Sequence, residues 1–190
     1  MIHKLIRNTK LTSEYESGVS LRSVEHNPAS SNDSHHFSAQ VHLDGERIMK
    51  VGNDGRGGNH YYTPRKICTP VIAKDLVKRS SLFCKHARKE VYHQINKDSC
   101  DNFAFVDVLV SNLLNEHLTR ESMRKALRNR IHIIDLDRDK PLLYETNKRP
   151  TPIHLANSRK ALDGIGKHFN YILLNELDET SQLKLWLTIN

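Results

Sequence analysis

The sequence predicts an α+β fold: an N-terminal β-hairpin or small antiparallel sheet, central helices, and a C-terminal hairpin with short helices. Residues 37–51 alternate between apolar and polar side chains around a turn signal, and residues 70–130 space their apolar residues as helices do. Residues 131–146 return to strand-like runs around a second turn signal. Strands thus precede and follow the helices, which argues against alternating βαβ units.

The first 36 residues are expected to form a flexible N-terminal arm. Residues 1–22 hold a weak strand or a short helix, and residues 23–36 are polar, contain Pro28 and lack apolar periodicity. Such a segment can become ordered when it meets a partner. Residues 37–190 are expected to form a single α+β domain, because they are long enough to bury one core.

An N-terminal hairpin is predicted around Asp44-Gly45. This dipeptide favours a type I′ turn, in which both central residues have positive φ. Residues 47–51 form the second strand, and residues 59–63 are expected to form a third. The first strand buries the alternate residues Phe37, Ala39, Val41 and Leu43.

Three helices are expected in the centre of the chain. Thr69 and Pro70 have the residue types of an N-cap and a first helical position, and this helix should end near Asn96. Residues 103–118 form a second helix with a buried apolar stripe. Thr119 is expected to cap a third, short helix that ends near residue 130.

The last 60 residues are expected to add a hairpin and short helices. Two short strands, residues 131–136 and 142–146, flank an Asp-rich turn. Asn157 is expected to cap a short helix, residues 169–174 form a strand or a buried helical turn, and Asp178 caps the last helix.

The net charge of +7 is concentrated in the middle of the chain. Residues 64–130 carry 14 basic and 7 acidic side chains, whereas the two flanking parts are neutral. A local excess of this kind directs the chain toward an anionic partner, either nucleic acid or an acidic protein surface, although it also suits a solvated helical face. The basic residues expected to contact the partner are Lys74, Lys78, Lys85, Arg88, Lys89, Arg120, Arg124, Lys125 and Arg128.

Residues 52–58 contain four of the eight glycines in the chain. The spacing fits neither a P-loop nor a dinucleotide-binding fingerprint. Two interpretations remain: backbone amides that hold an anion with the help of Arg56 and His60, or an elaborate turn in which Asn53 and Asp54 bond to their own backbone. The residues of this region expected to contact a partner are Gly55, Arg56, Gly57, Gly58, His60 and Tyr61.

These residues also carry a resemblance. The run from Val41 to Glu46, followed by residues 51–58, resembles small uncharacterised phage and bacterial proteins with an N-terminal DG…NDGxGG hairpin. Those proteins also have an LNE segment near the C-terminus, which matches Leu174-Asn175-Glu176. The resemblance implies a phage or mobile-element origin and assigns no catalytic residue.

Candidates for metal binding are weak, and neither a metal nor a cofactor is predicted. A zinc site assembled from Cys84, His86, His93 and Cys100 would match none of the common ligand spacings. Asp135, Asp137 and Asp139 follow one another at strand spacing beside Lys140. They could bind Mg²⁺ as in a nuclease, but Asp-rich turn chemistry explains the same pattern.

The sequence also bears on the compartment. It has no apolar run long enough to span a membrane and no apolar core of a signal peptide at the N-terminus. Three sparse cysteines fit free thiols in a reducing cytosol. We therefore expect a protein of the host cytoplasm, with association with the virion as the alternative.

These observations leave three hypotheses of different classes. The first is a non-enzymatic phage or mobile-element protein that docks on a large assembly, such as a capsid or a host defence complex, through its basic centre and its arm. The second is a nucleic-acid-binding module that uses the same basic residues. The third is a metal-dependent nuclease built on the acids at 135–139.

Overall fold

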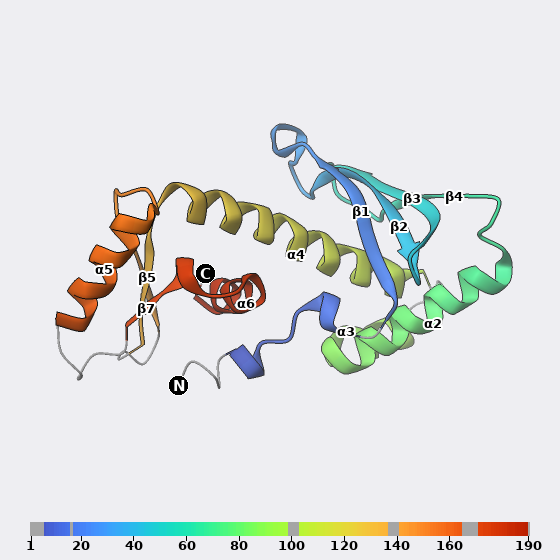
Figure 1. Ribbon diagram of the computed structural model, residues 1–190. Helices are drawn as coiled ribbons and strands as arrows, with labels where there is room; N and C mark the ends of the chain where they lie inside the picture. The colour runs from blue at the N-terminus through green and yellow to red at the C-terminus, as the bar shows by residue number, and fades with distance from the viewer. Residues whose placement is uncertain (1–5, 16, 99–102, 137–140, 165–170, 190) are drawn as a thin grey trace. The chain divides into compact units, whose positions relative to one another are not determined.

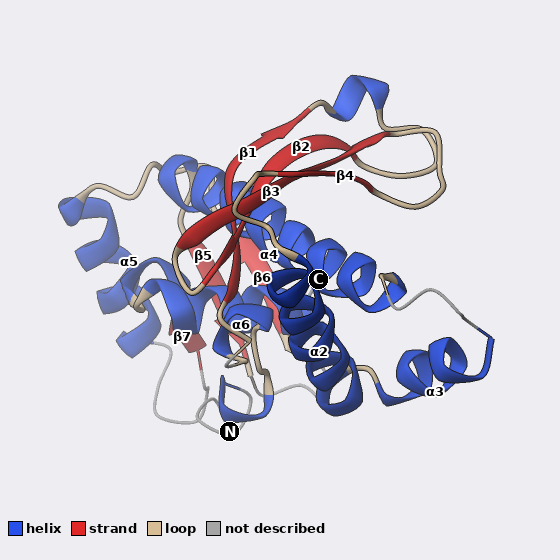
Figure 2. Ribbon diagram, turned by 90° about the vertical axis from the view of Figure 1, so that its right-hand side faces the viewer, coloured by secondary structure: helices blue, strands red, loops and turns tan. Residues whose placement is uncertain are grey.

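The computed structural model describes residues 6–15, 17–98, 103–136, 141–164 and 171–189, and it confirms the predicted α+β class (Figure 1). An N-terminal four-stranded antiparallel sheet is followed by helices, a small three-stranded antiparallel sheet and a C-terminal helix. Figure 2 shows the same elements coloured by type of secondary structure.

The chain divides into two compact units. The sheet unit comprises residues 12–116, and the C-terminal unit comprises residues 1–11 and 117–190. Helix α4, Ala104–Asn129, contributes its first half to the sheet unit and its second half to the C-terminal unit. This division differs from the predicted one, in which an arm ended at residue 36.

The sheet unit is built on the predicted hairpin. Strands β2, His36–Leu43, and β3, Glu46–Asp54, pair antiparallel around Asp44 and Gly45, whose φ angles are 50° and 87°. Both positive values fit the type I′ turn that the sequence predicts. Strand β4, Tyr61–Pro64, pairs with β3 as the third strand.

A further strand, β1, lies at the edge of this sheet. Val19–His26 pairs antiparallel with β2, so the prediction of a loop from residue 23 is wrong for residues 23–26. Only Val19 of this strand is buried, and the register shifts between Arg22 and Glu25. The irregularity breaks the alternation by which a strand is recognised in a sequence. Flexibility of residues 1–36 in the free protein stays a prediction.

Two helices replace the single helix that was predicted to start at Thr69 and end near Asn96. Helix α2, Pro70–Ala87, begins as predicted, with the Thr69 hydroxyl accepting a bond from the amide of Ile72 at 3.4 Å. It ends at Arg88, which has φ −139° and ψ 57°, and helix α3, Lys89–Asp98, starts directly afterwards. The predicted continuous helix to Asn96 is therefore wrong. The sequence does not signal the break, because neither Gly nor Pro occurs there.

Helix α4 also differs from the prediction. It runs unbroken from Ala104 to Asn129, so Thr119 does not cap a separate helix. The apolar stripe explains the continuity, since Leu109 and Leu113 before Thr119 lie on the same face of the helix as Met123 and Leu127 after it, and all four are buried. Burial of one continuous stripe outweighs the local preference of threonine for a cap.

Arg79 joins helix α2 to the turn of the hairpin. Its two terminal nitrogens donate to the two carboxylate oxygens of Asp44, each at 2.8 Å, and one also donates to the carbonyl of Ser17 at 3.3 Å. Its Nε donates to Asp75 at 3.0 Å, one helical turn earlier. A single side chain thus connects α2, the β2–β3 turn and the segment that leads into β1.

The C-terminal unit contains the second predicted hairpin. Strands β5, His132–Asp135, and β6, Leu142–Glu145, pair antiparallel, and β7, Tyr171–Leu173, pairs with the other edge of β5. For residues 169–174 the sequence left open a strand or a helical turn. Strand β7 covers residues 171–173, and the 3-10 turn η3, Leu174–Glu176, follows it, while residues 169 and 170 lie outside the described residues.

Two helices complete this unit. Helix α6, Glu179–Ile189, is capped as predicted, because the carboxylate of Asp178 accepts bonds from the amide and hydroxyl of Ser181 at 3.0 and 2.6 Å. Helix α5, Pro152–Gly164, begins at a proline after Thr151, so Asn157 lies inside it and is not its cap. The core of the unit consists of Leu11, Met123, Leu127, Ile134, Leu136, Leu174, Leu183 and Leu185.

Asn175 closes the end of α4. Its amide nitrogen donates to the carbonyls of Leu127 and Arg130 at 2.9 and 3.0 Å, and its oxygen accepts the amide of His132 at 2.7 Å. The side chain thereby satisfies carbonyls at the helix end and holds the first residue of β5. Within the LNE segment, Leu174 belongs to the core and Glu176 pairs with Arg159.

We expect Asn175→Ala to lower the free energy of unfolding of the C-terminal unit by about 2–3 kcal/mol, because it leaves backbone groups without partners. The single tryptophan of the chain, Trp186, lies in this unit, so urea unfolding followed by its fluorescence reports the change. The matched control is Asn157→Ala on the exposed side of α5, which should change stability by less than about 0.5 kcal/mol. Equal effects of the two changes would contradict the role of Asn175.

Candidate binding surface

The basic residues predicted on α2 lie on one exposed face. Lys74, Lys78 and Lys85 are all exposed, and their spacing of 4 and 7 residues keeps them on the same side of the helix. Arg88 and Lys89 continue the exposed charge at the junction with α3. We call these five residues the basic face. Glu90 is exposed beside it and reduces its charge.

Arg88 also has a structural role in the sheet unit. Its Nε and one terminal nitrogen donate to the side-chain oxygen of Asn112 in α4, at 3.2 and 2.6 Å. Asn112 is itself held by its own bond to the carbonyl of Val108 at 2.8 Å. The bond therefore anchors the junction between α2 and α3 on α4 and leaves the three lysines of α2 as the freer charges.

A cleft of about 440 Å³ lies beside these lysines. Lys74 and Lys78 stand at its edge, and Val77, Phe103 and Phe105 supply apolar walls. The remaining lining residues are Ala73, Ser81 and Asn96. Elsewhere on α2, Val71 and Leu82 are 75% and 47% exposed. The basic face is thus interleaved with accessible apolar surface, which the sequence analysis did not anticipate.

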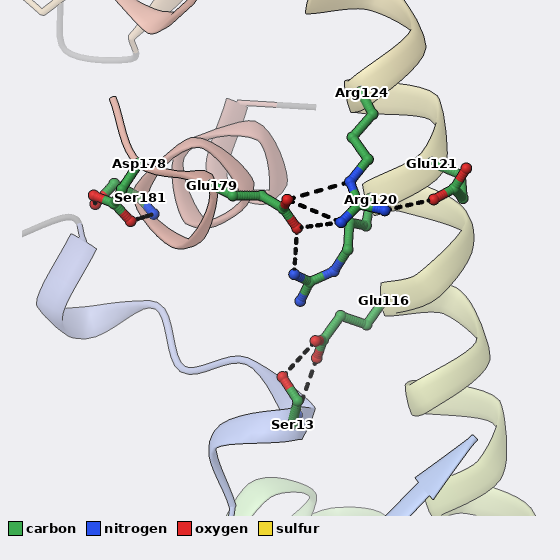
Figure 3. Close-up of polar contacts among 8 residues, drawn as sticks. All are labelled: Ser13, Glu116, Arg120, Glu121, Arg124, Asp178, Glu179 and Ser181. Carbon is green, nitrogen blue, oxygen red and sulfur yellow. Dashed lines mark hydrogen bonds and ion pairs between the residues drawn. The ribbon is translucent and has the colours of Figure 1, made fainter. Parts of the chain in front are cut away.

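The basic residues predicted on α4 have a different environment. Arg120 and Arg124 both donate to the carboxylate of Glu179 at the start of α6, over 2.6 Å and 2.9 Å, and Arg124 also bonds Glu121 at 2.8 Å (Figure 3). Lys125 and Arg128 are exposed on the same helix. The sequence could not distinguish the two paired arginines from the others, because Glu179 lies more than 50 residues away.

These arginines change the titration of Glu179. Hydrogen bonds from Arg124 and then Arg120 lower the pKa of the Glu179 carboxyl below its ordinary value of 4.5. A carboxyl with a depressed pKa in the folded state stabilises that state above the unfolded pKa, and the contribution disappears as the pH falls through the folded pKa.

We expect Glu179→Gln to destabilise the C-terminal unit at neutral pH by about 1 kcal/mol or less, since the pair is more than a third exposed and solvent screens it. The difference from the unmodified protein should shrink as the pH falls below about 4.5. Trp186 fluorescence during urea unfolding at several pH values measures it. A difference that stays constant down to pH 3 would show that the carboxylate charge has no part.

The glycine loop is organised around Asn53, which is 2% exposed. The Asn53 side-chain oxygen accepts the amide of Gly55 at 2.8 Å and the hydroxyl of Ser34 at 2.7 Å. Its nitrogen donates to the carbonyl of Gly58 at 3.2 Å. This is the elaborate turn that the sequence analysis offered as one of two interpretations.

Three consecutive backbone amides of the loop, those of residues 55–57, already have acceptors. The amide of Arg56 donates to Asp54 at 3.1 Å, and that of Gly57 donates to the hydroxyl of Ser34 at 3.1 Å. An anion would have to displace these bonds, so the geometry favours the turn over the anion-binding nest. Arg56 and Gly58 remain exposed.

His60 forms a contact with Ser111 that sequence reasoning missed. Its Nε2 lies 2.9 Å from the Ser111 hydroxyl, as in the pairs that activate a nucleophile. Asn53 is oriented by the amide of Gly55, so its side-chain nitrogen faces Nδ1 of His60 at 3.4 Å. Nδ1 is then the acceptor and Nε2 carries the hydrogen, which is the wrong tautomer for a base acting on Ser111. Burial lowers the pKa of His60, consistent with a neutral ring.

The two tyrosines after the loop differ in accessibility. Tyr62 donates its hydroxyl to Asp107 at 2.5 Å, and its ring packs edge-on against Phe103. Tyr61 is 52% exposed and can contact a partner. Tyr61 and Tyr62 therefore do not form the pair of exposed aromatic rings on which single-strand binders stack bases.

We expect Gly55→Ala to be far more damaging than Gly58→Ala. Both have φ above 80°, but a Cβ at Gly55 would lie 2.2 Å from the carbonyl of Ser30, whereas one at Gly58 would meet nothing within 4 Å. The expected losses of stability are about 3 kcal/mol and about 1 kcal/mol. Urea unfolding followed by circular dichroism tests this. Similar losses would mean that the turn relaxes around an added methyl group.

The candidate metal ligands do not assemble among the described residues, where no group of three or more His, Cys, Asp or Glu side chains could hold an ion. Cys84 is buried with its thiol facing the carbonyl of Phe105, and burial raises its pKa to about 11, so it is a protonated core residue. Cys100, Asp137, Asp139 and Lys140 lie outside the described residues. Asp135 is 6% exposed at the end of β5.

Comparisons of the chain with protein-family models, with curated proteins and with solved structures gave no match. In the described part of the chain, no helix is both long and apolar enough to cross a membrane.

Proposed function

We propose that this protein is a non-enzymatic docking protein that binds an acidic surface of a large phage or host protein assembly, such as a capsid or a host defence complex. The observation that supports it is the mixture of exposed lysines and accessible apolar groups on α2. The resemblance of the hairpin to small phage and bacterial proteins is the reason to look for that assembly in a phage or its host.

The mixed chemistry favours a protein partner over nucleic acid. Phosphate groups attract the lysines alone and gain nothing from Val71, Leu82 or the cleft. A protein surface that carries both carboxylates and apolar side chains complements all of these features at once. The lysines then steer and orient the partner, while apolar burial holds it.

Nucleic-acid binding is the second candidate. It is favoured by the three exposed lysines of α2, which could contact successive phosphates. The nuclease hypothesis depends on Asp137 and Asp139, which lie outside the described residues, and stays a prediction without structural support.

We expect the triple variant Lys74→Glu, Lys78→Glu, Lys85→Glu to lose its partner. The matched control reverses the exposed lysines Lys50, Lys148 and Lys160, which changes the net charge equally. The measurement is affinity capture from host lysate, with and without nuclease treatment, and identification of the captured proteins. Reversal on α2 should abolish capture, because like charges then face the acidic partner, and salt should weaken it through screening.

Three results would count against this proposal. Capture that disappears after nuclease treatment would support the nucleic-acid candidate instead. Retention of the same protein by the α2 triple variant would show that the basic face is not the docking surface. Equal loss in the control variant would indicate a general effect of net charge.

A further inference from the structure

We propose that the cleft beside Lys74 and Lys78 receives an apolar anchor side chain from an acidic peptide segment of the partner. This inference rests on the proposed docking function and names the chemistry of the docked element: a short segment in which carboxylates flank a leucine or an aromatic residue. Three features of the cleft support it: the apolar lining, the two lysines and the volume.

The lining of the cleft is apolar on two sides. Ala73 and Val77 come from α2, Phe103 directly precedes α4, and Phe105 lies in the first turn of α4. Phe105 is 3% exposed, so its ring forms the base of the cleft and is braced by Tyr92 of α3, whose ring centroid lies 5.7 Å away. An aliphatic or aromatic side chain that enters this space removes apolar area on both partners from water.

The edge of the cleft is cationic. Lys74 and Lys78 are one helical turn apart, and within the described ranges neither is paired with a carboxylate. Two ammonium groups at that spacing meet carboxylates on either side of an anchor residue. Ser81 and Asn96 add polar groups that can bond to the backbone of an extended segment.

The cleft is large enough for one anchor side chain together with its neighbouring backbone. Its volume of about 440 Å³ is at the lower end of the range of roughly 300–1,000 Å³ typical of binding pockets. Interfaces concentrate their binding energy in a few residues that fill such pockets, while the surrounding contacts exclude water. A single large side chain with its neighbouring backbone satisfies this pattern.

Two other cavities fit this chemistry less well. The cavity of about 540 Å³ in the C-terminal unit has Arg124 in its wall, but that arginine is already bonded to Glu179 and Glu121. The cavity next to the glycine loop has a mainly polar lining without lysine or arginine: Ser31, Asn32, Asp33, Ser34, His35, His60, Ser111, Leu114 and Asn115. Neither places two lysines beside a pair of phenylalanine side chains, as the cleft of α2 does.

The test uses the full chain and a displayed library of acid-rich peptides with randomised central positions. Peptides that are enriched on the unmodified protein are synthesised, and their dissociation constants are measured by fluorescence anisotropy. Ala73→Leu fills the cleft, and Lys74→Glu with Lys78→Glu removes its cationic edge. The control is Ile153→Ala, which shortens an exposed apolar side chain of α5 that lies outside the cleft and the basic face.

We expect the enriched peptides to share a leucine or an aromatic residue between carboxylates. Filling the cleft should raise the dissociation constant at least tenfold, reversing the two lysines should do the same, and the control should change it less than twofold. A peptide carrying a photoreactive benzophenone side chain at the anchor position should crosslink within residues 73–81 or 103–105. This mapping needs only the unmodified protein, so it decides the question even where a filled variant folds poorly.

Other outcomes separate this inference from the function on which it rests. Acidic peptides that bind without a shared anchor, crosslink elsewhere and lose affinity only on lysine reversal would overturn the anchor and leave the docking function in place. Absence of any enriched acidic peptide, together with retention of duplex DNA, would overturn both and support nucleic-acid binding. Absence of both ligands would also overturn the anchor proposal, since the cleft would then have no acidic occupant.

Discussion

The bidentate bond between Arg79 and Asp44 is the contact on which the sheet unit depends most directly. It fixes the middle of α2 against the turn that joins β2 and β3, and the third bond to Ser17 adds the segment before β1. With α2 held in this rotation, Leu76 and Phe83 are buried and Lys74 and Lys78 are exposed. The ion pair is thus compatible with the same orientation of α2 that burial of Leu76 and Phe83 requires, and this orientation exposes the candidate binding surface.

Polar side chains also join segments that are distant in the sequence within the C-terminal unit. Glu179 gathers Arg120 and Arg124, and Asn175 joins the end of α4 to the start of β5. Exposed ion pairs of this kind contribute little free energy each, but they select one packing of the helices among several of similar apolar burial. Each unit thus combines an apolar core with a few polar contacts between segments far apart in the sequence.

What could be predicted from the sequence follows from this division between local and distant contacts. The Asp44-Gly45 turn and the caps Thr69 and Asp178 depend on neighbouring residues, and all three were predicted. Thr119 and Asn157 have the side chains of caps, but buried stripes and an earlier start signal override them. Asp44, which pairs with Arg79, and Glu179, which pairs with Arg120 and Arg124, lie far away along the chain, so the sequence alone does not reveal these pairs. The cleft is likewise formed by α2, α3 and α4 together, and no local pattern marks it.

The structure also separates the predicted contact residues into those with internal bonding partners and those that remain available to a partner. In the glycine loop, the amides of residues 55–57 and the side chain of Asn53 form the hydrogen bonds that shape the turn. This explains why the loop contains so many glycines without requiring a bound ligand. Arg120 and Arg124 of α4 are bonded to the carboxylate of Glu179, while Lys74 and Lys78 of α2 line a cleft with apolar walls. Charges at the edge of an apolar depression act at two stages of association: long-range attraction raises the rate of encounter, and burial of the anchor lengthens the lifetime of the complex. A surface that had only the lysines would attract a partner but would not hold it for long. The cleft, and not the net charge, is therefore the feature that points to a specific partner.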